Sequence, residues 1–145
     1  MPRLLAYLPC EKIIIDSDNN VSLISVLQDL KVQVPEAGPV PGPAVTAAMK
    51  WQILTMWLID PGDVGKFYEE KVALFDPDGA PTAVKGSVGN ETTGAGHRNV
   101  VTVLGFPIGK EGRHSLRLWM YERGNDPGEP IAEYPIRVSH DILKK

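Results

Sequence analysis

The feature that most constrains the fold is a regular alternation of side chains along one short stretch. One face of that stretch carries His114, Leu116, Leu118 and Met120, and the other carries Ser115, Arg117, Trp119 and Tyr121. A period of two residues is that of a β-strand with one face over a core. We therefore expect this strand to lie at the centre of a β-sandwich.

The rest of the chain repeats this signal in shorter form. Strands are expected at 4–15 (interrupted at Pro9), 21–23, 30–34, 49–59, 65–75, 82–88, 99–104, 114–122 and 131–140. About eight short strands with regular turn signals, no amphipathic helix and no repeat predict an all-β chain. We expect a single antiparallel Greek-key β-sandwich of immunoglobulin-like type over residues 1–145, with a barrel as the alternative.

Several connections can be interpreted from their turn residues. The alternation breaks over 24–29, which predicts a bulge or a strand that changes sheets. Pro35–Pro43 holds four prolines and is expected to be an exposed crossover between sheets. Residues 89–96 are expected to form a flexible loop and 141–145 a frayed tail. Pro135 indicates that the last strand lies at a sheet edge.

Charge and apolar run lengths exclude some partners. The net charge is −3 and Lys and Arg do not cluster, so we expect no nucleic-acid partner. The apolar run 53–59 is too short to span a bilayer, so no membrane partner is expected. The single cysteine, Cys10, excludes an intrachain disulfide and fits the cytoplasm, where we place the protein. We interpret its thiol as inert.

Two acidic turns have the opening spacing of a calcium loop only in part. Asp16, Asp18 and Asn20 fit that spacing, but Val21 stands where a glycine is needed. The twelfth loop position, a glutamate in such loops, is Leu27. We interpret this turn, and the similar turn at 76–79, as hairpin turns, and expect no metal and no cofactor.

The histidines do not form a metal or catalytic motif. His97, His114 and His140 have no partner at metal-ligand spacing, and no nucleophile elbow or phosphate loop is present. His114 is expected to be a hydrogen-bonded core residue at the corner formed by 111–113, where immunoglobulin-like sandwiches usually have a Tyr. His97, beside Arg98 in the expected glycine-rich loop, is the better candidate for a functional role.

The most suggestive surface residues are large and lie opposite core positions. Arg117, Trp119 and Tyr121 point away from the core face of their strand, and these residue types dominate interface hot spots. Leu54, Met56 and Leu58 likewise oppose Trp51 and Ile53. We expect one outer face to carry both sets and to bind a second copy or a protein partner, unless loops cover it. No small-molecule ligand is expected.

Four segments resemble a family of small uncharacterised bacterial proteins. They are 10–16 with 20–24, 75–79, 97–101, and 105–109 with the Gly-x-x-x-Leu-Arg-Leu of 112–118. The resemblance covers most of the chain and implies a β-rich domain of unknown function. Relatives of this kind would commonly have a Tyr where His114 stands, and the resemblance implies no catalytic residue.

Together these observations favour a non-enzymatic binding or assembly module. A small hydrolase or metal-dependent enzyme using His97, His114 or loop Asp residues stays open, as does a structural part of a larger bacterial or phage-derived assembly. The expected core residues are Trp51, Ile53, Val72, Leu74, Val101, Val103, Leu116, Leu118, Ile136 and Val138.

Overall fold

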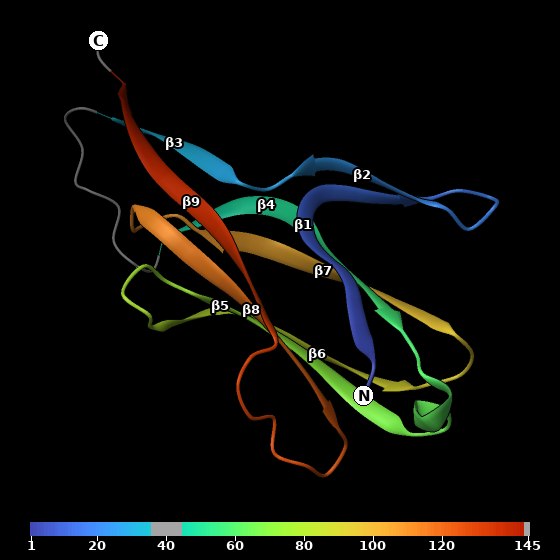
Figure 1. Ribbon diagram of the computed structural model, residues 1–145. Coiled ribbons are helices and arrows are strands. Elements are labelled where there is room, and N and C mark those ends of the chain that lie inside the picture. The colour runs from blue at the N-terminus through green and yellow to red at the C-terminus, as the bar shows by residue number, and fades with distance from the viewer. Residues whose placement is uncertain (36–44, 144–145) are drawn as a thin grey trace.

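The structure is a computed structural model that describes residues 1–35 and 45–143, and in it these residues form two β-sheets (Figure 1). Sheet A has the strand order β2-β1-β4-β7, and sheet B has the order β3-β9-β8-β5-β6. The strands are β1 (Arg3–Ile15), β2 (Val21–Val26), β3 (Asp29–Pro35), β4 (Thr46–Leu58), β5 (Phe67–Phe75), β6 (Pro81–Glu91), β7 (Gly96–Pro107), β8 (Gly112–Glu122) and β9 (Ala132–Leu143).

The expected all-β class is confirmed. The described residues contain one 3₁₀ turn, Pro61–Asp63, and no α-helix. Sheet B is curled into a half-barrel. No helix in this part of the chain is long and apolar enough to cross a membrane.

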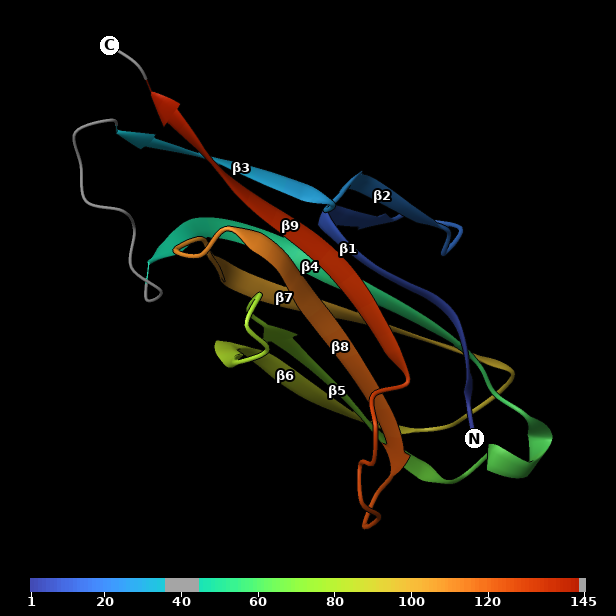
Figure 2. The same cartoon turned by 60° about the vertical axis from the view of Figure 1, so that its left-hand side comes forward.

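Strand pairing is antiparallel in every described pair except β3 with β9, which run parallel. β1 is continuous through Pro9, contrary to the expected interruption, and pairs with β4 as far as Cys10. Beyond Cys10 it pairs only with β2, so this hairpin projects from the body of the sandwich (Figure 1). The irregular stretch 24–29 does contain a change of sheet, because β2 belongs to sheet A and β3 to sheet B (Figure 2).

Three expectations about connections are wrong. The loop expected over 89–96 is shorter, since β6 continues to Glu91 and β7 begins at Gly96. The expected tail is partly strand, because β9 runs to Leu143, while 144–145 lie outside the described residues. β9 is internal, between β8 and β3. Pro135 is tolerated there because the pairing with β3 begins only at Arg137, so its missing N–H breaks no bond to β3.

The expected crossover at 35–43 lies outside the described residues apart from Pro35, whose backbone ends β3. The strands on either side of this segment, β3 and β4, belong to different sheets.

The core between the sheets follows the alternation predicted from the sequence. All ten expected core residues belong to the hydrophobic cluster, with Val101 and Val103 half-buried and the other eight buried. Two buried hydrogen bonds come from aromatic side chains of the core. The Tyr7 hydroxyl donates to the Leu116 carbonyl at 2.9 Å, and the Trp51 indole donates to the Gly105 carbonyl at 2.9 Å. The first bond joins sheet A to the centre of β8 in sheet B.

Candidate functional site

The residues expected to share one outer face lie on opposite faces of the sandwich. β4 belongs to sheet A and β8 to sheet B, so Leu54, Met56 and Leu58 cannot lie beside Trp119 and Tyr121. The expectation of a single face was wrong because alternation gives the side of a strand and not the sheet to which it belongs. Each face is therefore described separately.

The outer face of β5 and β8 holds three cations against three aromatic rings. The Lys71 ammonium lies 5.0 Å from the Trp119 ring centre, and the Arg117 guanidinium lies 4.1 Å from the Phe75 ring centre. Arg123 lies 3.5 Å from the ring of Phe67. Such contacts fix flexible cationic side chains in place. We call the residues Phe67, Glu69, Lys71, Phe75, Arg117, Trp119, Tyr121 and Arg123 the sheet B face.

Hydrogen bonds hold the aromatic groups of the sheet B face. The Trp119 indole donates to the Gly128 carbonyl at 3.2 Å, and the Tyr121 hydroxyl donates to Glu69 at 3.1 Å. Burial, and then the bond to Glu69, raises the pKa of Tyr121. Trp119 and Tyr121 are both half-buried, because the β8–β9 loop covers one end of the face. The face is therefore ordered and partly covered, with apolar surface still reaching solvent.

The outer face of sheet A is aliphatic. Leu54 is only 3% exposed, because it pairs with Leu8 on β1 and Val100 on β7, whose side chains flank it on the same face. Met56 and Leu58 are half-buried. Leu54 itself thus offers little contact surface, contrary to its expected role in an interface.

Arg98 also points outward from sheet A. Its guanidinium donates to the Asn19 backbone carbonyl at 3.1 Å and to the Asn19 side chain at 2.6 Å. These bonds anchor the β1–β2 turn to β7, so the structure gives Arg98 a local structural contact.

His97 lies inside a polar network and not in a loop. It belongs to β7 and is half-buried, and its Nε2 lies 2.9 Å from the Asn90 Oδ1 and 3.0 Å from the Asn99 Oδ1. The Asn99 amide nitrogen donates to Glu70 at 2.7 Å, and the Trp57 indole donates to the other Glu70 oxygen at 3.0 Å. Because the Asn99 nitrogen faces Glu70, its oxygen faces His97, and the His97 Nε2 carries the hydrogen.

Glu70 is the member of this network that sequence reasoning missed. Its side chain is buried at 1% exposure between the two sheets, and both carboxyl oxygens accept hydrogen bonds. The signal was present in the alternation of β5, because Glu70 has the same parity as Tyr68 and Val72, which face the core. A charged residue at an inward position indicates a buried polar network.

His114 lines a second cluster at the other end of the core. It is 1% exposed and packs edge-on against Phe106, with ring centres 5.6 Å apart. Its burial is as expected, and its Nδ1 has no hydrogen-bond partner among the described residues. Burial lowers the pKa of His114. The residue lines a cavity of ≈ 470 Å³ together with Asp76 and Lys110.

Lys110 binds the acidic turn at 76–79. Its ammonium lies 3.0 Å from Asp76 and 2.8 Å from Asp78, and these two hydrogen bonds raise the pKa of Lys110. Asp76 also accepts the backbone N–H groups of Asp78 and Ala80, as a hairpin turn requires. Asp16 caps the turn of the β1–β2 hairpin in the same way. The described residues contain no group of three metal-ligating side chains.

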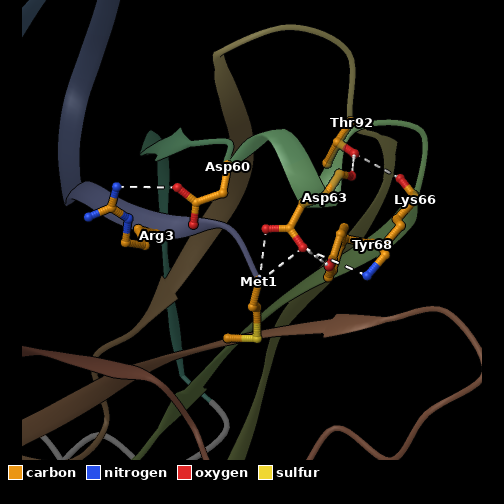
Figure 3. Close-up of polar contacts among 7 residues, drawn as sticks. All are labelled: Met1, Arg3, Asp60, Asp63, Lys66, Tyr68 and Thr92. Carbon is orange, nitrogen blue, oxygen red and sulfur yellow. Dashed lines mark hydrogen bonds and ion pairs between the residues drawn. The ribbon is translucent and has the colours of Figure 1, made fainter.

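A third cluster surrounds Asp63 and includes Met1, the first residue of the sequence (Figure 3). Its carboxylate accepts hydrogen bonds from the Met1 amino group at 3.0 Å and from the Tyr68 hydroxyl at 2.8 Å, with the Lys66 ammonium at 4.0 Å. The Thr92 hydroxyl donates to the carbonyls of Asp63 and Lys66. The bond from Met1, followed by that from Tyr68, lowers the pKa of Asp63. Burial, followed by Asp63, raises the pKa of Tyr68 to about 12.

Comparison with known proteins adds no family. No protein-family model matches this chain, and a search of curated proteins found no match.

The lowered pKa of Asp63 predicts an acid-sensitive contribution to stability. The pKa of this carboxylate is lower in the folded than in the unfolded state, so its charge stabilises the fold at pH values above its unfolded pKa of about 3.9. This stabilisation is lost as the pH falls through the folded-state pKa. Asp63→Asn should be less stable than the wild type at pH 7, and the difference should shrink below about pH 4. Urea unfolding at pH 7 and pH 3 measures it. An equal difference at both values would show that the carboxylate charge is irrelevant.

Proposed function

We propose that the protein is a non-enzymatic binding module whose sheet B face contacts a second copy of the chain. The observation that carries this is the set of three cation–aromatic contacts on one sheet face. Trp, Tyr and Arg are the residue types that supply most of the binding energy at protein interfaces. Here they are already held by contacts within the chain, which reduces the entropy lost on binding.

The charges of the sheet B face favour a second copy over a strongly charged partner. Three cations, Lys71, Arg117 and Arg123, share the area with the carboxylates of Glu69 and Glu133, which lie 3.3 Å from Arg123 and 3.9 Å from Arg117. A face with both signs does not repel its own copy. Two-fold dimers join identical patches, so each patch must supply both halves of every contact.

The strand order supports the finer fold assignment that we propose, a Greek-key sandwich of immunoglobulin-like type. Sheet A contains β1, β4 and β7 in this order, and sheet B contains β9, β8, β5 and β6 in this order. We also propose membership of the uncharacterised bacterial family that the sequence resembles. A cytoplasmic location is proposed from the single cysteine, Cys10, which is buried.

An enzymatic role is the second candidate, and its site would be the cavity beside His114. A buried histidine beside a cavity, with an Nδ1 that has no hydrogen-bond partner among the described residues, is the observation that favours it. We rank it lower because the neighbouring Asp76 and Lys110 bind each other. A dimeric module is also compatible with a role as a part of a larger assembly.

Sedimentation over 1–100 µM tests the proposed dimer. We expect a concentration-dependent dimer, and Trp119→Ala should weaken it at least about tenfold because this ring is the largest on the face. Met56→Ala, on the opposite face, is the matched control and should leave the dimer unchanged. A monomer throughout this range, or a dimer lost only in Met56→Ala, contradicts the proposal.

A further inference from the structure

The two sheets do not close against each other along one side of the sandwich. β6 is an edge strand of sheet B and β7 is an edge strand of sheet A. The two strands follow each other in sequence, yet no strand pairing joins them in the described part of the chain. One side of β7 therefore presents a row of backbone N–H and C=O groups without a strand partner among the described residues.

A cleft lies between these two edges. Its volume is ≈ 310 Å³, and its lining includes Val72, Val84, Val101 and Val103 from the core. Val72 is buried, whereas the other three are half-buried. Gly86 on β6 also lines the cleft. Its missing side chain leaves room, since a Cβ there would lie 3.8 Å from Val101 and 3.9 Å from Val72.

The two edges differ in their protection against strand addition. β6 begins with Pro81, which lacks an N–H, and carries the exposed Lys85, and both features discourage pairing. The stretch Asn99–Gly109, which holds most of β7, contains no charged residue. Leu104 on β7 is 80% exposed and Val100 is 37% exposed. β7 is therefore uncharged and mostly apolar over residues 99–104, with the charged Arg98 before this stretch and Pro107 after it.

We propose that this cleft accepts an extended segment of a partner protein, which pairs with β7 and places alternate apolar side chains over the core valines. An added strand would form hydrogen bonds with the free backbone groups of β7 and would also cover the apolar floor of the cleft. Strand addition to a sheet edge is a known recognition mode. A helix would leave the backbone groups of β7 unpaired. Lys85, which forms no ion pair within the described residues, favours a carboxylate at an outward position of the segment.

A second copy of this chain fits the cleft less well. The β7 strand of the second copy could pair with β7 of the first. However, the inward side chains Val101 and Val103 of the second copy already pack against the core of that copy. They could not also fill the cleft of the first copy. The occupant is therefore a segment whose apolar side chains are free before binding.

A labelled nonapeptide with valine at every second position and two glutamates among the other positions is the probe. Fluorescence anisotropy should show saturable binding to the full chain, and hydrogen exchange of β7 amides should slow in the complex. Gly86→Leu places its Cβ at ordinary contact distances from Val101 and Val72 and the rest of its side chain in the cleft, so the variant should bind at least tenfold more weakly. The same peptide with proline for its central valine should not bind.

Ile24→Ala is the matched control, because Ile24 is an exposed apolar residue on β2, the opposite edge of sheet A. This variant should bind the peptide as the wild type does. No binding at millimolar peptide, equal binding by Gly86→Leu, or protection confined to β2 would each overturn the proposal. So would competition of the peptide with self-association of the chain, since that would make a second copy the occupant.

Discussion

Leu116→Ala should lower the free energy of unfolding by about 2–5 kcal/mol. Leu116 is fully buried at the centre of β8, with β5 on one side and β9 on the other. Removing its side chain leaves a cavity. The two sheets cannot move together to close it, because each strand is held in place by pairing with its neighbouring strands. The Tyr7 hydroxyl bonds the Leu116 backbone, so that bond is kept and the loss reports packing alone.

Urea unfolding followed by tryptophan fluorescence measures this loss. Leu104→Ala is the matched control, since Leu104 is 80% exposed and its truncation should change stability by less than about 0.5 kcal/mol. Equal stabilities of the two variants would mean that β8 does not lie at the centre of the core.

Glu70→Ala should cost about 2–4 kcal/mol, for a different physical reason. The carboxyl group accepts hydrogen bonds from the Trp57 indole and the Asn99 amide inside the sandwich. Its removal leaves both donors buried without an acceptor, and each such group costs about 1–3 kcal/mol. The Asn99 amide would also lose what orients it toward His97.

Glu70→Gln separates hydrogen bonding from volume. Glutamine keeps the shape of the side chain and one acceptor, but it places an NH₂ group against the second donor. The decrease in the free energy of unfolding should therefore be smaller, about 1–2 kcal/mol. Glu91→Ala on the exposed side of β6 is the control and should be nearly neutral. A Glu70→Ala variant as stable as this control would show that the network does not stabilise the fold.

Alternation predicted the core because burial on one side of a strand is a local property of the sequence. It gave the inward positions of β4, β5, β7, β8 and β9, on which all ten expected core residues lie. It could not give strand neighbours, because pairing depends on residues far apart in the chain. That is why Leu54 and Trp119 were expected on one face, whereas the expectation of β9 at an edge came from Pro135.

The candidate sites were predicted less well than the core. Residue type identified Trp119 and Tyr121, but their partners Gly128 and Glu69 are set by the tertiary fold. His97 was expected in a loop because glycines surround it, whereas β7 begins at Gly96 and carries it into the interior. No local sequence pattern predicts the open side between β6 and β7. It arises because β6 is the edge strand of one sheet and β7 the edge strand of the other.

The parallel pair of β3 and β9 has a consequence for how the protein is made. β3 is synthesised early, yet among the described residues it pairs only with β9, at positions 137–143. While the chain is being synthesised, β3 must therefore wait with its apolar residues uncovered until β9 has left the ribosome. Closing so long a loop is slow compared with forming hairpins. During that interval the uncovered edge of β3 can pair with other chains.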